Sequence, residues 1–145
     1  MLHQRKPLDQ PEQKILLIDS EPALLALLQE LLEGEGYAVF ACSQVRQALE
    51  WVEATKPDLI ILDPWQGSAS AWGVVAQLAA DPMVGNVPCI FYSVDHKGLK
   101  EHESELGTRG WVVLPKPFDL EALVEVVSGL IGAGRALESK ELIPA

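Results

Sequence analysis

Four residues with reactive or charged side chains each stand at or just beyond the end of a short apolar run in this sequence of 145 residues. They are Asp19, Asp63, Ser93 and Lys116, and Glu21 lies close to the first of them. Because the carboxyl ends of parallel strands meet at one edge of a sheet, we expect these side chains to lie together. Two neighbouring carboxylates repel a bare phosphate in a partly desolvated site, whereas their hard oxygens suit Mg²⁺. The pattern therefore predicts a magnesium-dependent phosphate site.

The same residues indicate which atom carries the phosphate. With the cation bound, the hydroxyl of Ser93 and the ammonium of Lys116 can hold the oxygens of a phosphoryl group on Asp63. This interpretation predicts an aspartyl phosphate at Asp63. Two plainer interpretations stay open at this point: Asp63 only caps the following helix, and Glu21 only stabilises the positive end of a helix dipole.

Strands and helices alternate along the chain to position these residues. Four consecutive aliphatic residues, 59–62, are typical of a central strand that is buried on both faces. Further strands are predicted at residues 14–19, 37–42, 87–93 and 111–114, and helices at residues 23–33, 43–55, 71–80, 95–106 and 119–131. This alternation predicts an α/β fold with a single doubly wound, five-stranded parallel sheet and helices on both faces.

Several local features of these elements are also predicted. Ser43 and Asp119 are suitable N-caps for the second and the last helix. Residues 66–70 are small and polar, which is typical of a loop. The helix at residues 95–106 is charged and has few apolar anchors, so we expect it to be exposed and mobile.

Composition limits the class of protein. We expect one domain at residues 14–131, a flexible leader at residues 1–13 and a tail at residues 132–145. The formal net charge of -10 argues against binding to nucleic acid or to an anionic membrane surface. The longest apolar segments are too interrupted to span a bilayer, and the polar leader lacks the core of a secretion signal, so a cytoplasmic location is expected. Cys42 and Cys89 have no metal-binding spacing and are predicted to be buried free thiols.

The order and spacing of three motifs resemble the receiver domain of two-component response regulators, from residue 14 to about residue 131. The segment DSEP at residues 19–22 is similar to the acidic turn of that family, and PDLIILD at residues 57–63 to its phosphoacceptor strand. LPKPF at residues 114–118 is similar to its lysine motif, and Ser93 stands where the family has a switch Ser or Thr. No single motif is specific, but their combination is.

The resemblance implies a fold, a chemistry and partners. The fold is the CheY-like, flavodoxin-like sheet with strand order 2-1-3-4-5. Asp63 would receive a phosphoryl group from a histidine kinase or histidine phosphotransferase, with Mg²⁺ held by Asp19, Asp63, Glu21 and the backbone carbonyl of Trp65. Apart from its own phosphorylation and dephosphorylation, the domain would not be an enzyme. Phosphorylation would draw Ser93 toward Asp63 and change the surface of the last two helices, which would bind a downstream protein and are candidates for a homodimer contact.

Departures from the family pattern leave other functions open. Ser20 stands in place of the second acid, and Pro64 removes a backbone N–H directly after the predicted phosphoacceptor. The indole of Trp65 is expected to shield an acyl phosphate from water. Val113 replaces an aromatic residue that commonly couples to the switch hydroxyl, so this coupling is expected to be absent or shifted to Trp111.

These departures permit an alternative function, a degenerate receiver that binds its partner without phosphorylation. A further alternative is an enzyme or flavin carrier on a flavodoxin-like sheet. It is disfavoured because no glycine-rich phosphate loop follows the first strand and the acids there would repel one.

Overall fold

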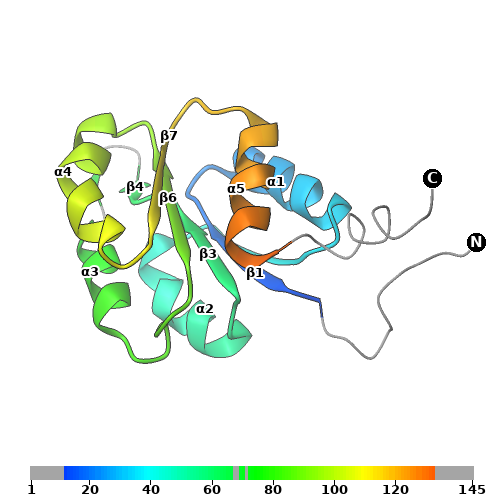
Figure 1. Cartoon of the computed structure of the whole chain (residues 1–145), viewed down its shortest axis with the longest axis horizontal. Helices are drawn as coiled ribbons and strands as arrows, with labels where there is room; N and C mark the ends of the chain where they lie inside the picture. The colour runs from blue at the N-terminus through cyan, green and yellow to red at the C-terminus, as the bar shows by residue number, and fades with distance from the viewer. Residues whose placement is uncertain (1–11, 67–68, 71, 133–145) are drawn as a thin grey trace, which may run out of the picture.

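The main sheet of the computed structural model, which describes residues 12–66, 69–70 and 72–132, is parallel and five-stranded (Figure 1). Its strands lie in the order β2-β1-β3-β6-β7 and have the bounds Ala38–Cys42, Lys14–Ile18, Leu59–Leu62, Cys89–Ser93 and Val112–Pro115. Numbered along the chain within this sheet, that order is 2-1-3-4-5, which confirms the predicted topology. Most of the predicted leader and tail lies outside the described residues.

The burial of each strand follows its place in the sheet. Every residue of β3 and β6 is buried, as are four of the five residues of β1, and these three strands form the centre. The edge strands β2 and β7 are only partly buried. A strand that is covered on both faces needs apolar side chains at successive positions, which is why the central strands are continuous aliphatic or aromatic runs.

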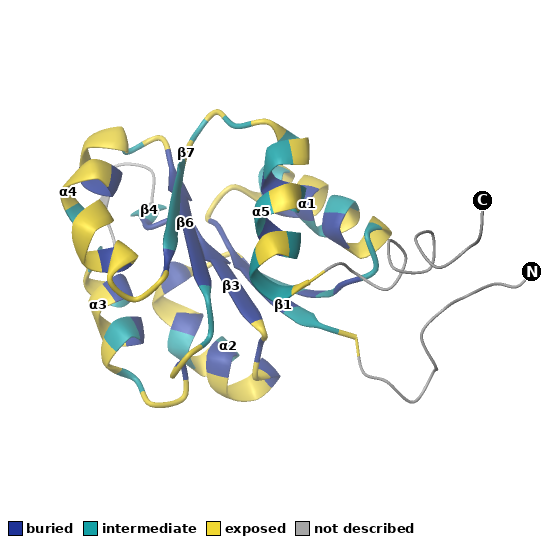
Figure 2. Ribbon diagram, viewed as in Figure 1, coloured by how far each residue is buried: buried dark blue, intermediate teal, exposed yellow. Residues whose placement is uncertain are grey.

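In the described part of the chain, five α-helices cover the two faces of the sheet (Figure 2). Helices α1 and α5, Pro22–Gly34 and Leu120–Ile131, pack on one face, where their leucines and valines join the odd-numbered residues of β1 and β3. Helices α2, α3 and α4, Ala48–Thr55, Trp72–Ala80 and His96–Gly107, cover the opposite face. The sheet is therefore doubly wound, as predicted, and its core is split into two apolar layers.

The structure differs from the sequence predictions in several details. Where a loop was expected, β4 (Trp65–Gln66) and β5 (Ala69–Ser70) pair as antiparallel strands. A 3₁₀ turn, Val45–Gln47, precedes α2, so Gln44 rather than Ser43 occupies the N-cap position of this segment. Strand β6 begins after Pro88, which has no N–H to donate to the neighbouring strand.

Other local predictions agree with the structure. The side chain of Asp119 caps α5 by accepting a hydrogen bond of 3.1 Å from the backbone N–H of Glu121. Helix α4 is largely exposed and is anchored by buried Leu99 and Leu106. Both cysteines are buried free thiols. Within the described part of the chain, no helix is both long and apolar enough to cross a membrane.

Candidate functional site

Asp19, Asp63, Ser93 and Lys116 lie at one edge of the sheet, as the sequence predicted. Each directly follows or ends a strand, and backbone hydrogen bonds extend the ladders to the edge: Asp63 N–H donates to Ile18 O at 3.0 Å and Lys116 N–H donates to Ser93 O at 2.9 Å. Parallel strands in this register bring their carboxyl ends together. The sheet therefore holds the backbone of the site rigidly.

The ammonium of Lys116 bridges the two carboxylates. Its Nζ lies 2.8 Å from Asp63 Oδ2 and 3.0 Å from Asp19 Oδ2. The side chains are 13%, 5% and 1% exposed for Lys116, Asp63 and Asp19, so these ion pairs are largely shielded from water. Burial acts to lower the pKa of the Lys116 ammonium, but the hydrogen bonds to Asp63 and Asp19 outweigh burial and raise that pKa above its ordinary value.

The second oxygen of each carboxylate accepts a backbone hydrogen bond from two residues further along the chain. Asp19 Oδ1 accepts from the N–H of Glu21, and Asp63 Oδ1 accepts from the N–H of Trp65, both at 2.8 Å. The second bond forms although Pro64 itself has no N–H to offer. Both carboxylates are thus held in fixed orientations, with one oxygen toward the backbone and the other toward Lys116.

Ser93 is completely buried and faces the start of α4 rather than the carboxylates. Its Oγ accepts a hydrogen bond of 3.1 Å from the backbone N–H of Asp95. Asp95 in turn caps α4, because its Oδ1 accepts from the N–H of Gly98 at 3.0 Å. In this structure Ser93 therefore belongs to the β6–α4 connection, and only its backbone is tied to Lys116.

Trp72, on α3, connects this loop to the surface of α4. Its Nε1 donates to Asp95 Oδ2 at 3.2 Å, and its ring stacks on that of His102 with centroids 4.1 Å apart and planes 6° from parallel. A Cβ at Gly98 would meet Asp95 Oδ2 at 2.2 Å, so this close arrangement needs a glycine. The sequence reasoning missed the contact, because Asp95 and Trp72 belong to different helical segments and only the fold brings them together.

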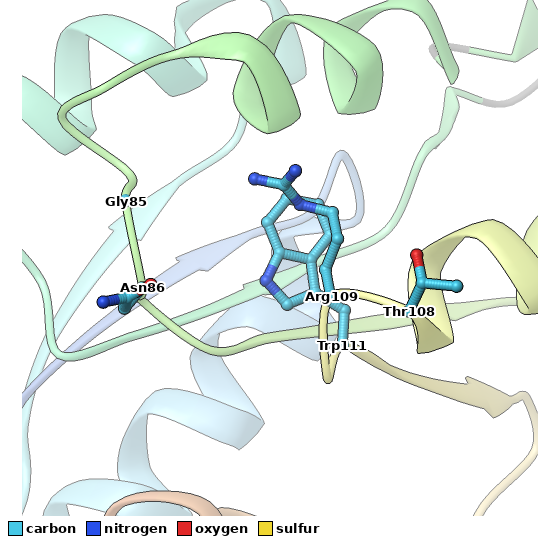
Figure 3. A pocket seen from close by; sticks show the side chains of 5 residues that line it. All are labelled: Gly85, Asn86, Thr108, Arg109 and Trp111. Atoms are coloured by element: carbon cyan, nitrogen blue, oxygen red, sulfur yellow. The ribbon is translucent and has the colours of Figure 1, made fainter.

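The sequence suggested Trp111 as an aromatic partner for Ser93. In the structure, Trp111 lies at the opposite, amino-terminal end of the parallel strands. It directly precedes β7, and its Nε1 donates to Val87 O at 3.2 Å. It helps to line a pocket of about 390 Å³ together with Gly85, Asn86, Thr108 and Arg109. In Figure 3 the guanidinium of Arg109 lies over the Trp111 indole, and the distance from Cζ to the ring centroid is 4.6 Å. The indole that reaches the connection after Ser93 is that of Trp72.

Tyr92 is a further polar residue at the edge, and the sequence reasoning did not single it out. Its side chain is completely buried, its ring stacks on Phe118 at 5.6 Å between centroids, and Lys116 Nζ lies 4.5 Å from the ring centroid. The available signal was strand alternation, which places Tyr92 opposite to Ser93 and on the face that α1 and α5 cover.

The residues proposed as metal ligands are only partly brought together. Asp19 and Asp63 meet at Lys116, whereas Glu21 is exposed. The backbone N–H of Trp65 contacts Asp63 Oδ1, and its carbonyl as a metal ligand stays a prediction. Among the described residues, no three His, Cys, Asp or Glu side chains converge closely enough to hold a metal ion. Two buried carboxylates are nevertheless a donor set that suits Mg²⁺, because this ion commonly takes one or two protein carboxylates and keeps several waters.

Comparisons with known proteins agree with this geometry. The sequence model of one protein family, described as the response regulator receiver domain, matches residues 15–128. The alkaline phosphatase synthesis transcriptional regulatory protein PhoP of Bacillus subtilis is 31% identical to this chain. The match covers 79% of this chain and 48% of PhoP. Protein Rrf1 of Nitratidesulfovibrio vulgaris is 30% identical, and the match covers 79% of each protein. The structure of the chemotaxis response regulator CheY4 of Vibrio cholerae has the same fold, with a TM-score of 0.70, 21% identity and coverage of 83% of this chain and 99% of CheY4.

Proposed function

The chain belongs to the family of response regulator receiver domains, and we propose that it accepts a phosphoryl group on Asp63 from a phosphohistidine of a kinase or phosphotransferase. The observation that carries this proposal is the partly buried ammonium of Lys116 between the buried carboxylates of Asp63 and Asp19. A cation in that position offsets part of the negative charge of the two acids at rest and is within reach of a phosphoryl group on Asp63. Several of the curated relatives are longer than this chain, so any output activity is a separate question.

The transfer itself requires little of the protein beyond positioning. An oxygen of the Asp63 carboxylate forms a bond to phosphorus while the bond from phosphorus to the donor imidazole nitrogen breaks, and the electron pair leaves with the imidazole. The hydrogen bond from Trp65 N–H to Asp63 Oδ1 fixes one oxygen, so Oδ2, which now contacts Lys116, is the oxygen that attacks. Lys116 then turns its N–H groups to the phosphoryl oxygens.

Receiver domains of this family generally bind Mg²⁺ at the phosphorylation site. In this chain Asp19 and Asp63 would hold it, with Glu21 and the carbonyl of Trp65 as further ligands, and it would neutralise charge on the phosphoryl oxygens. Ser20 contributes at most a hydroxyl where the family pattern has a second acid, so we expect weaker binding of the metal than a complete acidic pair would give.

The signal would leave the site through Ser93 and α4. A phosphoryl group on Asp63 offers the Ser93 hydroxyl a charged acceptor, which would draw Ser93 Oγ away from its present position against Asp95 N–H. Movement of Ser93 would loosen Asp95, which caps α4 and holds the Trp72 indole. The surface of α4 and α5 would then change its affinity for a downstream protein, and a homodimer through these helices stays a prediction.

Phosphotransfer with a matched pair of variants tests this function. The chain is incubated with Mg²⁺ and a small acyl phosphate, and intact-protein mass spectrometry follows the addition of one phosphoryl group. We expect wild type to be modified and Asp63→Asn to stay unmodified. Asp58→Asn is the control, because Asp58 precedes the same strand at its other end and is exposed. Equal modification of both variants would place the phosphoacceptor elsewhere.

A receiver that binds its partner without phosphorylation is the alternative. Two observations favour it: Lys116 already forms an ion pair with each carboxylate, and no third metal-ligating side chain joins them in the described residues. The same assay separates the two functions. Failure of wild type to accept a phosphoryl group or to bind beryllofluoride, a mimic of the phosphoryl group, at millimolar Mg²⁺ would leave the alternative as the better proposal.

A further inference from the structure

Lys116 stands between two prolines, Pro115 and Pro117, which have no backbone N–H. The backbone of residues 115–117 can therefore donate one hydrogen bond, from Lys116, and this bond goes to Ser93 O at 2.9 Å. Any further hydrogen bond to this backbone must reach one of its carbonyl oxygens from a donor elsewhere in the chain. The aim of the Lys116 side chain thus depends on what such a donor is.

The ring of His96 supplies this donor. His96 is the first residue of α4, and its Nε2 contacts the carbonyl oxygen of Lys116. A carbonyl oxygen only accepts hydrogen bonds, so Nε2 carries the hydrogen and donates it, in the neutral ring as well as in the charged ring. The connection between β6 and α4 therefore holds the Lys116 backbone on both sides, the N–H through Ser93 and the carbonyl through His96.

These two contacts fix the base of a side chain whose tip does the chemistry. Lys116 Nζ lies 2.8 Å from Asp63 Oδ2 and 3.0 Å from Asp19 Oδ2, at the end of a flexible four-carbon stem. During transfer the same ammonium has to meet the oxygens of the phosphoryl group, and a small displacement of a positioned group lowers a reaction rate strongly. His96 itself is exposed to solvent, so its ring is not explained by packing in the core.

We propose that His96 is a positioning residue, which donates from Nε2 to the Lys116 carbonyl and thereby aims the Lys116 ammonium at a phosphoryl group on Asp63. This inference rests on the function proposed above. It adds a residue that the sequence motifs do not contain. Because His96 begins α4, the same hydrogen bond also connects that helix to the loop that carries Lys116.

Three variants of the full chain separate positioning from structural support. His96→Ala removes the donor, and His96→Gln keeps an N–H donor at a similar reach. Lys97→Ala is the control, because Lys97 is the next residue of the same helix and its side chain is 88% exposed. Phosphorylation by a small acyl phosphate with Mg²⁺ is followed by intact-protein mass spectrometry over time, in about 0.15 M salt to screen exposed charges.

The rate and the stability should respond differently. We expect the rate of phosphorylation to fall roughly five-fold in His96→Ala, to recover in His96→Gln and to be unchanged in Lys97→Ala. The unfolding midpoint in EDTA should stay close to that of wild type in all three, because water can replace an exposed hydrogen bond but cannot tie α4 to Lys116.

The carbonyl carbon of Lys116 gives a readout that does not depend on phosphorylation. Carbon-13 in lysine carbonyls and nitrogen-15 in proline select the three Lys–Pro pairs of the sequence, and Lys116→Met identifies the signal of Lys116 by its loss. We expect this signal to shift in His96→Ala, where the carbonyl loses its donor, and to keep its wild-type position in Lys97→Ala.

The outcomes separate this inference from the function on which it rests. A wild-type rate of phosphorylation in His96→Ala, or a Lys116 carbonyl signal that this substitution does not move, overturns the role of His96 alone. Equally slow phosphorylation of His96→Ala and His96→Gln, with a lowered unfolding midpoint in both, would show a purely structural role and also overturns it. A wild-type chain that accepts no phosphoryl group overturns the phosphoacceptor function and this role in transfer together, even where the carbonyl signal confirms the contact.

Discussion

Replacing Lys116 with methionine tests the electrostatics of the site most directly. The substitution keeps an unbranched side chain of similar volume and removes the positive charge. Asp19 and Asp63, whose side chains are 1% and 5% exposed, would then face each other without a counter-charge. Removing one partner from a buried ion pair costs about 3–5 kcal/mol, because the remaining charge stays desolvated. Lys116 keeps 13% of its side-chain exposure, so we expect a loss near the lower end, about 3 kcal/mol.

The assay for this prediction is thermal or denaturant unfolding in EDTA. For a chain of this size a loss of about 3 kcal/mol lowers the unfolding midpoint by about 10 °C. Mg²⁺ should recover more stability in Lys116→Met than in wild type, because no other positive charge remains between the acids. Adding Asp63→Asn should also recover part of the loss, since it removes one of the two opposed charges.

An exposed lysine supplies the control. The side chain of Lys97 is 88% exposed, and its Nζ lies 3.9 Å from Oε1 of Glu101, one helical turn away. Lys97→Met should therefore leave the unfolding midpoint unchanged. Lys116→Met with wild-type stability in EDTA would refute the reasoning. That result would mean that Lys116 is not the charge that holds Asp19 and Asp63 together.

Three further predictions concern the scaffold. Gly98→Ala should destabilise α4 and shift tryptophan fluorescence, because the added Cβ would meet Asp95 Oδ2 at 2.2 Å. A Cβ added at Gly129 would have no atom within 4 Å, so Gly129→Ala should stabilise α5 by roughly 0.5–1 kcal/mol in denaturant melts. Asp119→Ala should cost about 1 kcal/mol in the same assay, because α5 loses its N-cap; an unchanged midpoint would contradict the cap. Burial raises the pKa of the Cys89 thiol above its ordinary value of 9.0, so only the unfolded chain releases this proton above that pH and stability should fall as the pH rises. Cys89→Ala should show a smaller fall between about pH 9 and about pH 11, and equal slopes would argue against a strongly shifted thiol.

The fold could be predicted from the sequence because its central strands leave few alternatives. A run such as residues 59–62 is apolar at every position, which requires cover on both faces of a sheet. The placement of Asp19, Asp63, Ser93 and Lys116 at one edge followed from a topological rule that needs no knowledge of side-chain conformations. The hairpin of β4 and β5 was missed because each strand has only two residues, too few for any periodicity.

The contacts within the site could not be predicted in the same way. Periodicity gives the face on which a side chain lies, but not the direction of its last bonds. The sequence therefore predicted that Lys116 lies at the edge, but not that it bridges both acids. It likewise predicted the place of Ser93, but not that its hydroxyl turns toward Asp95. The position of Tyr92 beside Lys116 escaped notice for the same reason, since a tyrosine in a buried strand is usually explained by packing in the core.

The large sequence separation between Lys116 and the two acids that it pairs with has a consequence for folding. The two acids sit at the ends of adjacent strands β1 and β3, but their counter-charge lies 97 and 53 residues further along. During refolding, pairing of β1 with β3 therefore opposes two like charges until β7 docks through β6. That repulsion penalises intermediates in which only the first half of the sheet is formed. The site thus makes folding more cooperative, because Lys116 reaches the two acids only when both halves of the sheet are assembled.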